Sequence, residues 1–546
     1  MAADASVPSK PPATNINIIH EGISTDRSSF TPHDVIADIW ASLGLPAAAL
    51  SAVDLPGSEH AGPVLPSSYR IGCLAQSSIA LSALSAALVH SVRNASVEKE
   101  KEKAAAASLP RITVPQRHAT AEFLSVQHCS IINTAAPAND SPQPRPRPPS
   151  PILDIHPTAE EGGRIRIHTA FPHHRDGALQ LLGLDPASRT SLTRADIDAQ
   201  TRQWRSRDLE AAGLAAGCAM YALRSYDEWD VGEEAQASAV LDVPVRVRRI
   251  GGGGGGAAAG AGAGRPRPGV TAAGRRRLLS GLRILELTRV IAGPVAGRTL
   301  AAHGADVLWV TAPHLPALPV VDRDVARGKR TAQLDLRLES DREQLRKLIA
   351  SCDVFLQGYR PGSLAARGWE EEDLVRMNPG IVVANMSAFG PEEPWRGRRG
   401  FDSLVQTCSG MNVSEAEHFN GEEKEGEKGA RVLPCQALDH ASGYFLAMGI
   451  CAALYKGEVE GGGAFCVDVS LAGTMKYLRS LGQYEGRSGF DCAGFTAEEV
   501  EGYLEVRESG LGVLKAVRHS ASVEGFEPGW DRMPQPLGSD EAEWQS

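Results

Sequence analysis

Short apolar runs alternate with amphipathic, helix-like segments between residues 282 and 390. Runs such as "LRILELT" and "ADVLWV" are typical of strands that are buried on both faces of a parallel sheet. The intervening segments carry helix signals, such as Pro294 in a first turn and Ser340 as an N-cap. We therefore predict a doubly wound, Rossmann-like parallel α/β sheet with helices on both faces. Its strands are expected at residues 282–288, 305–310, 331–336, 353–359 and 381–390.

Two longer apolar segments lie far apart in the chain, at residues 69–92 and 431–457. Both contain "AAL" near the end, and both are followed by a linker and a short strand-like run. When the two "AAL" triplets are aligned, Cys73 falls opposite Asp439. The pair favours an internal repeat, with two unrelated Ala-rich buried helices as the alternative. Each run is about helix length and is interrupted by Ser or Gly, and we expect both to be too short to span a bilayer.

Composition limits the classes of function. The 546 residues suggest about three or four domain-sized units. The net charge of −10 argues against nucleic acid as the main partner, because binding phosphates requires a basic surface. The nine cysteines are scattered singly and none has metal-ligand spacing, which is typical of reduced thiols inside a cell. The first residues lack the apolar core of a secretory signal, so we expect an intracellular, cytoplasmic protein, with mitochondria and peroxisomes left open.

Several motifs of other enzyme classes are absent or incomplete. The loop "TRVIAGPVAG" lies where a dinucleotide fingerprint would stand, but it lacks G-x-G-x-x-G. The segment "RGKRT" lacks the leading Gly of a phosphate loop, and Arg330 replaces the residue that would hold magnesium. His173 and His174 are adjacent, so their side chains diverge, and we interpret them as a surface pair without a metal. No metal cofactor is therefore expected.

Seven successive blocks resemble the family III CoA-transferases, the group of formyl-CoA and carnitine-CoA transferases that also includes α-methylacyl-CoA racemase. These blocks are "LSGLRILELTRVIAGPVAGRTLAAHGADVLWV", "RGKRTAQLDL", "DVFLQGYRPGSLAARG", "MNPGIVVANMSAFG", "GFDSLVQTCSGM", "ALDHASGYFLAMGICAALYKG" and "VDVSLAGTM". Residues from Tyr69 to about Asp230 resemble a degenerate copy of the family's later portion. The resemblance thus implies the interlocked architecture of that family, with its smaller α+β domain, partly duplicated and permuted.

Low-complexity stretches and the resemblance together give the expected domains. The Pro-rich stretch and the poly-Gly run are taken as linkers. The predicted order is a disordered N-terminus (1–29), a degenerate partial copy (30–135), a Pro-rich linker (136–163), a small-domain-like segment (164–248), a Gly/Ala/Arg linker (249–274), the CoA-transferase family III domain (275–480) and a truncated C-terminal segment (481–546).

The resemblance assigns a catalytic role to one acid, Asp439. In the family an aspartate at this position is the covalent nucleophile, which passes through a mixed anhydride and an aspartyl-CoA thioester. A helix N-terminus keeps a carboxylate ionised and stabilises oxyanions nearby. The alternative is that Asp439 is the N-cap of a buried helix, since Asp is a favoured capping residue.

The resemblance also implies residues that bind coenzyme A. These are the loop Val290, Ile291, Ala292, Gly293 and Pro294, the basic Lys329, the aromatic Tyr359 and the nearby Arg367. The alternatives are a solvated turn for Lys329 and a core position for Tyr359. The sequence departs from the family at Gly358-Tyr359, where "NF" is usual, and at Ala366, where the family has Arg. The basic residue after the second strand is missing too.

We therefore expect an intracellular acyl-CoA:carboxylate CoA-transferase whose substrates are an acyl-CoA and a small carboxylic acid. A racemase is the first alternative, but the family's racemases carry a His where this chain has Phe401, and Phe cannot transfer a proton. A non-catalytic CoA-binding protein is the second alternative. No membrane or nucleic-acid partner is expected, and a homodimer and an internal pseudo-dimer are both left open.

Overall fold

The computed structural model describes residues 25–60, 62–94, 109–132, 151–188, 191–231, 243–251, 276–421 and 429–545. The charged run that begins at Glu98, most of the Pro-rich linker and nearly all of the poly-Gly linker lie outside these residues. The expectation for the N-terminus can be assessed only from Thr25 onward, and helix α1 begins at Pro32.

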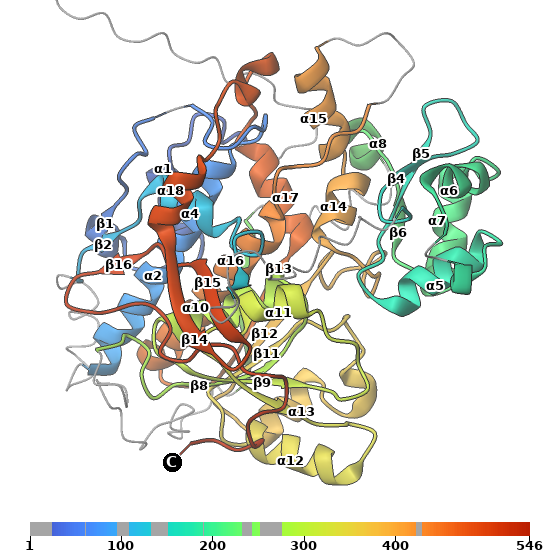
Figure 1. The fold of residues 1–546 in the computed structure, drawn as a ribbon. Helices are drawn as coiled ribbons and strands as arrows, with labels where there is room; N and C mark the ends of the chain where they lie inside the picture. Colours follow the sequence, from blue (N-terminus) through green and yellow to red (C-terminus); the bar gives the residue numbers. More distant parts are fainter. Residues whose placement is uncertain are drawn as a thin grey trace, which may run out of the picture.

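The centre of the fold is a seven-stranded sheet (Figure 1). All neighbouring pairs are parallel except the last, in which β7 runs antiparallel to β13. The predicted parallel sheet between Arg283 and Ala388 is therefore confirmed. In spatial order the strands are β10 (Arg330–Gln333), β9 (Asp306–Thr311), β8 (Arg283–Leu287), β11 (Val354–Gln357), β12 (Val382–Ser387), β13 (Ala464–Ser470) and β7 (Val245–Gly251).

Helices cover both faces of this sheet because successive strand residues point to opposite sides. Ile284 belongs to the core beneath α10 (Ala292–Ala302) and α16 (Ala437–Val459). Its neighbour Leu285 belongs to the second core, which also contains residues of α12 (Glu339–Ile349) and α13 (Glu371–Met377). The predicted helix with Ser340 at its N-cap starts two residues earlier. Its N-cap is Leu338, and no side chain caps it.

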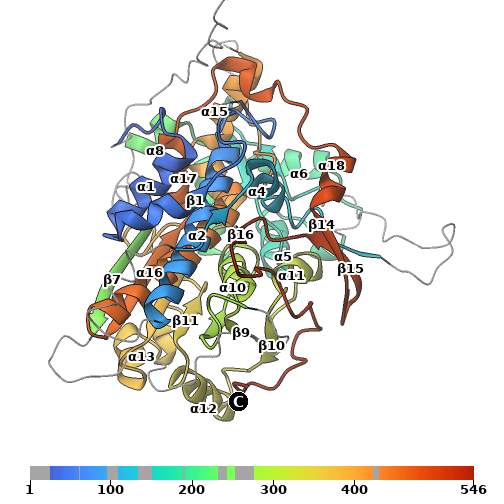
Figure 2. The same cartoon turned by 90° about the vertical axis from the view of Figure 1, so that its left-hand side faces the viewer.

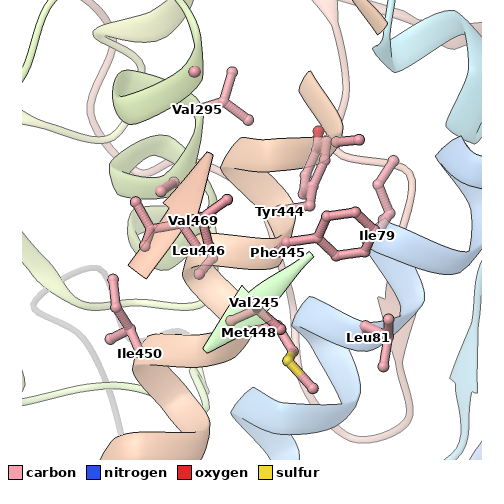
Figure 3. Close-up of a cluster of buried hydrophobic side chains, with 14 of the residues drawn as sticks. Ile79, Leu81, Val245, Val295, Tyr444, Phe445, Leu446, Met448, Ile450 and Val469 are labelled. Atoms are coloured by element: carbon pink, nitrogen blue, oxygen red, sulfur yellow. The ribbon is translucent and has the colours of Figure 1, made fainter. Parts of the chain in front are cut away.

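Helix α16 packs along α2 (Ile71–Asn94), so the two apolar segments singled out in the sequence are neighbours in space (Figure 3). Figure 3 shows Ile79 and Leu81 of α2 beside Phe445 and Met448 of α16. By length and composition both helices could cross a membrane, so the expectation that they are too short is wrong. They are, however, 100% and 94% buried inside the protein, as core helices are.

The N-terminal part packs its own small elements around α2, on the left of Figure 1. Strands β1 and β2 are parallel, and β16, from the C-terminal part, runs antiparallel to β2. The elements are α1 (Pro32–Ser42), η1 (Ala47–Ala52), β1 (Val53–Asp54), β2 (Ile112–Thr113), α4 (Gln116–Glu122) and β3 (Ser130–Ile132).

A small α/β unit with its own hydrophobic core follows, seen at the right of Figure 1. Its sheet has the order β4-β5-β6 and is antiparallel. Strand β4 lies inside the segment predicted as linker, so that linker ends earlier than expected. The elements are β4 (Ile155–Pro157), β5 (Arg164–Ile167), α5 (Pro172–Leu181), η2 (Pro186–Ser188), α6 (Arg194–Thr201), α7 (Ser206–Ala215), β6 (Met220–Ala222) and α8 (Tyr226–Val231).

The remaining elements come from the second half of the chain. They are α11 (Pro319–Val325), η3 (Ala365–Arg367), α14 (Asp402–Cys408), α15 (Met411–Asn420), α17 (Leu471–Ser480), η4 (Gly486–Phe490), α18 (Ala497–Tyr503), β14 (Leu504–Ser509), β15 (Gly512–Val517) and β16 (Ser522–Val523). The final residues return to the main sheet, where Asp540 accepts the backbone N–H of Thr331.

Two strands are exchanged between the N-terminal and C-terminal parts, whose close association is visible from the second direction in Figure 2. Strand β7 follows the N-terminal small unit and pairs antiparallel with β13. The other neighbour of β13 is β12, which is parallel to it. Strand β16 is the last strand of the C-terminal part and pairs antiparallel with β2. The other neighbour of β2 is β1, which is parallel to it. Each part thus supplies the outer strand of the other part's sheet. Because β7 starts at Val245, the predicted boundary at residue 248 cuts through a strand.

Candidate active site

Asp439 is the third residue of α16, and its side chain is 7% exposed. The N-cap of this helix is Gln436, and no side chain forms a capping hydrogen bond. Asp439 therefore does not cap the helix, which removes the capping interpretation. Among the described residues, none donates a hydrogen bond to its carboxyl group. A buried carboxyl group without a donor costs free energy, and such groups persist mainly where they serve a function.

Asp402 lies directly against the backbone of Asp439. Oδ2 of Asp402 accepts the backbone N–H of Asp439 at 3.0 Å, and the amide of Gln406 donates to the other oxygen. Asp402 is 1% exposed and opens α14, where the helix N-terminus favours an acid. Asp402 follows Phe401 in the "GFD" stretch, and it was not among the site residues predicted from the sequence. Its position in the first turn of a helix was the available signal.

The two carboxyl groups disfavour each other's charge. Burial, followed by the charge of Asp402, raises the pKa of Asp439 well above its usual value. Burial raises the pKa of Asp402 to about 6, although the N–H of Asp439 and the Gln406 amide act in the opposite direction. Two buried acids this close share a proton over a range of pH, and they titrate as a pair. One of them is therefore protonated when the other is ionised.

The loop between β8 and α10 reaches the same place. A Cβ atom on Gly443, one turn after Asp439, would lie 2.7 Å from the carbonyl oxygen of Ala292 and 2.6 Å from Cβ of Val295. The glycine therefore lets the first turn of α10 approach the start of α16 closely. Val290 has φ of 70°, the one positive φ of a non-glycine residue in the described chain. A β-branched residue is strained there, and such strain concentrates at functional sites.

The predicted CoA-binding residues fall into two groups. Val290 to Pro294 form the loop and first turn beside Asp439, and Val290 lines a hollow with Arg289 and Trp309 at the C-terminal ends of β8 and β9. This is the edge where open parallel sheets bind their ligands. Tyr359 follows the end of β11 and is half-buried. It lines a cavity of about 70 Å³ together with Arg360 and Gly400.

The remaining two residues are placed differently. Lys329 is fully buried, and its ammonium donates to Glu286 and to the carbonyl oxygen of Pro294, each at 2.8 Å. Lys329 is thus not a solvated turn residue. Its ammonium group holds the backbone of the predicted CoA loop at Pro294. Burial lowers its pKa to about 8. Arg367 is exposed in η3, where its guanidinium donates to the carbonyl oxygen of Ser363. Phosphate contacts by either residue stay predictions.

The N-terminal small unit forms one wall of the site. The ring of His168 stacks on Phe401, the residue before Asp402, with 3.7 Å between ring centroids. Tyr221 donates from its hydroxyl group to the carbonyl oxygen of Arg399 at 2.7 Å. His174, interpreted from the sequence as part of a surface pair, is 5% exposed and packs edge-on against Phe401. That interpretation is therefore wrong for His174, while His173 is exposed.

Part of the chain is similar to a known protein family. The model of CoA-transferase family III matches residues 279–486. An acetyl-coenzyme A transferase of Hypoxylon pulicicidum is 32% identical over 222 residues, which make up 40% of this chain and 36% of that protein. A formyl-CoA:oxalate CoA-transferase of Rhodopseudomonas palustris is 33% identical and covers 34% of this chain and 45% of its own length.

A third relative has a solved structure. It is a probable fatty acyl-CoA transferase of Mycobacterium tuberculosis, 33% identical over 34% of this chain and 48% of that protein. The orthorhombic crystal form of that protein gives a TM-score of 0.34 with 30% identity, and covers 38% of this chain and 57% of that chain.

The chain spans between about a third and a half of the length of these three curated relatives. The matched segment contains the β8–α10 loop, Asp402 and Asp439, whereas the N-terminal partial copy lies before it and stays a prediction. Residues 279–486 of this chain match the model of CoA-transferase family III, and the three relatives are similar to this chain over part of their length.

Proposed function

We propose that the chain is an acyl-CoA:carboxylate CoA-transferase with Asp439 as its nucleophile. The observation that carries this proposal is a buried carboxyl group that caps no helix and accepts no hydrogen bond from the described residues. It lies beside a second acid and beside the loop expected to hold coenzyme A. Three relatives named as CoA or acyl-CoA transferases support the same activity.

The proposed chemistry proceeds in balanced steps. The ionised carboxylate of Asp439 attacks the thioester carbonyl, the C–S bond breaks, and an aspartyl mixed anhydride and CoA thiolate form. The thiolate then attacks the aspartyl carbonyl of the anhydride, which releases the first acid as its carboxylate and leaves an aspartyl-CoA thioester. The second acid attacks this thioester, and the two steps run in reverse to release the new acyl-CoA. No proton is consumed overall.

The surroundings of Asp439 fit its role in these steps. Burial and the neighbouring Asp402 raise the pKa of Asp439, and a carboxylate that is basic and poorly solvated is a stronger nucleophile. The backbone N–H groups of Leu438 and Asp439, at the start of α16, are directed at the carboxyl group of Asp402 and hold this second acid beside the proposed nucleophile. A racemase would need a proton carrier at Phe401, which the phenyl ring cannot provide.

We also propose that one chain forms an internal pseudo-dimer, rather than pairing with a second copy. The support is the exchange of β7 and β16 between the two parts and the long contact between α2 and α16. The N-terminal part would then take the place of a partner subunit at the Asp439 site. Light scattering after gel filtration should give the mass of one chain, whereas a stable two-chain mass would contradict the pseudo-dimer.

The covalent intermediate provides the test of the activity. We expect that incubation with an acyl-CoA adds the mass of CoA minus water to the protein, on a peptide that contains Asp439. The Asp439→Asn chain should acquire no such adduct. Absence of the adduct from the wild-type chain, together with no exchange of CoA between acids, would refute the proposal.

A further inference from the structure

Glu286 and Lys329 form a buried ion pair under the first turns of α10. Both side chains are fully buried, and Nζ of Lys329 lies 2.8 Å from Oε1 of Glu286. Burial lowers the pKa of Lys329 to about 8, so its ammonium group is still charged at neutral pH and can donate to several acceptors. A buried ion pair is weak evidence for stability, because the cost of desolvating two charges can exceed the attraction between them. The pair therefore needs a role other than stability.

The ion pair is attached to both ends of the loop between β8 and α10. At one end, Lys329 donates to the carbonyl oxygen of Pro294 at 2.8 Å. At the other end, the hydroxyl group of Thr288 donates to Oε1 of Glu286 at 2.5 Å. The carbonyl oxygen of Thr288 in turn accepts the indole N–H of Trp309 at 2.9 Å. The loop is thus tied at its beginning and at its end to the same charged pair.

Two glycines of α10 let the helix lie directly on these side chains. A Cβ atom on Gly297 would overlap Oε2 of Glu286 and would lie 3.1 Å from Nζ of Lys329. A Cβ atom on Gly293 would lie 2.7 Å from Cγ2 of Thr288. Any larger residue at either position would therefore push the start of α10 away from the ion pair.

The loop has a strained conformation that needs support. Val290 has φ of 70°, which is unfavourable for a β-branched residue, and no side chain caps α10 at Ile291. Such strain persists only where the surrounding structure holds it in place. The loop must also keep its position, because the carbonyl oxygen of Ala292 packs closely against Gly443 of α16. The buried ion pair supplies this support from inside the protein.

We propose that Glu286 and Lys329 are positioning residues of the transferase reaction, which fix the β8–α10 loop so that it holds coenzyme A against Asp439. The inference rests on the proposed function and deepens it, because it gives Lys329 a role other than the predicted contact with a phosphate group. The ammonium group is closed to solvent, and its hydrogen-bond acceptors are Glu286 and Pro294. Both residues act through the loop and touch no atom of the substrate.

A truncated substrate separates positioning from a phosphate contact. S-acetylpantetheine has the same thioester as acetyl-CoA but carries none of its phosphate groups. Lys329→Met keeps the length of the side chain and removes the ammonium group. We expect it to lower kcat/KM at least about tenfold for both thioesters, as the loss of a charge-assisted hydrogen bond would, and to leave the ratio of the two values within about twofold of the wild-type ratio. A fall in kcat/KM for acetyl-CoA alone would show a phosphate contact and overturn the proposal.

Arg330→Met is the matched control. Arg330 follows Lys329 directly in the chain, but its guanidinium group pairs with Asp306 at 2.9 Å. This substitution removes a cation of the same strand without touching the loop. Both kcat/KM values should therefore stay within about twofold of the wild type. A loss as large as that of Lys329→Met would show a general effect on the sheet and overturn the proposal.

A double variant distinguishes positioning from a merely structural role. Lys329→Met alone leaves the charge of Glu286 buried without its partner, which lowers the melting temperature. Adding Glu286→Gln removes this charge, so the melting temperature should return toward that of the wild type. The value of kcat/KM should stay low, because the carbonyl oxygen of Pro294 still lacks its donor. Recovery of activity together with stability would overturn the proposal. If the single variant does not fold, the double variant decides.

Two measurements without turnover separate this inference from the proposed function. Hydrogen exchange followed by mass spectrometry should be faster for residues 289–296 in Lys329→Met than in Arg330→Met or the wild type. Titration calorimetry should show that Lys329→Met binds coenzyme A at least about tenfold more weakly than the wild type. If both effects are seen but the wild-type chain exchanges CoA between no acids, the proposed function fails and the positioning of the loop stands. Unchanged exchange in the loop, or an equal affinity of the two chains for coenzyme A, overturns the positioning whatever the activity.

Discussion

Helices α2 and α16 lie side by side and resemble each other in sequence, yet only one begins with an acid. Cys73 is the third residue of α2, and Asp439 is the third residue of α16. Both are buried, at 6% and 7% exposure. Burial raises the pKa of the Cys73 thiol to about 11, so at neutral pH it stays protonated. The same position is thus inert in one helix and suited to catalysis in the other.

The neighbours of the two helices explain this difference. The start of α16 faces α10 and its loop, and Gly443 permits their close approach. The position in α2 that corresponds to Gly443 is Ser77, whose hydroxyl group donates to the carbonyl oxygen of Cys73. In the described structure, α2 packs against α1, α4 and α16, and no large parallel sheet of the N-terminal part offers it a ligand-binding loop. A nucleophile is useful only where a substrate can be held against it.

The largest expected effect follows from removing the acid. Asp439→Asn should reduce transferase turnover by at least about a thousandfold, because an amide cannot form the anhydride. Since Asp439 caps nothing and its pKa is raised by burial and by Asp402, ionising it costs stability, and the variant should unfold at the same or a higher temperature at pH 7. Steady-state kinetics and calorimetric melting measure the two effects. Wild-type activity without deamidation back to Asp would contradict the assignment.

The sequence predicted the central sheet well because buried parallel strands leave a local signal in continuous apolar runs. It could not predict the exchange of β7 and β16, since two- to seven-residue edge strands carry little pattern and their pairing depends on distant residues. Asp439 was predicted as the nucleophile through its family block, and this role stays a prediction. His168 was missed and His174 was taken for a surface residue, because both come from a distant segment and only the fold brings them to Phe401.

The contrast between Gly443 and Ser77 is the second test. Gly443→Ala should lower the free energy of unfolding by about 1–2 kcal/mol, because the added methyl group clashes with Val295 and with the backbone at Ala292. It should also reduce activity, since the loop that we propose binds CoA must shift. Ser77→Ala loses one hydrogen bond within α2 and should cost about 0.5 kcal/mol or less. Denaturant unfolding of both variants measures this, and equal losses would show that the two helices are packed alike.

The third test concerns the like-charge pair, which we expect only at α16. Asp402→Asn keeps an oxygen that accepts the N–H of Asp439 but removes the neighbouring charge. The pKa of Asp439 should therefore fall, and the acid limb of the kcat profile should move to lower pH.

The same variant should change the dependence of stability on pH. The folded-state pKa of Asp402 is raised to about 6, so its contribution to stability is full below its unfolded value near 4 and is lost as pH rises through 6. Asp402→Asn should flatten this decline between about pH 4 and 6. An acid limb that stays in place would show that Asp402 does not act on the nucleophile.

The smallest expected effect is on Cys73, the residue of α2 that corresponds to Asp439 in α16. A thiol with a pKa near 11 that is almost fully buried has little thiolate and little access, so iodoacetamide should modify it slowly in the native protein.

Cys492 is the matched reference, because it is the one cysteine of the nine that is not buried. Peptide mapping over time should show Cys492 modified first, with no loss of transferase activity attributable to Cys73. Cys73→Ala should likewise retain activity, because the loop that we propose binds CoA lies against α16. Rapid, selective labelling of Cys73 would show instead that both helix starts are reactive, and that the difference between them lies in the chemistry of the side chain rather than in what is packed against it.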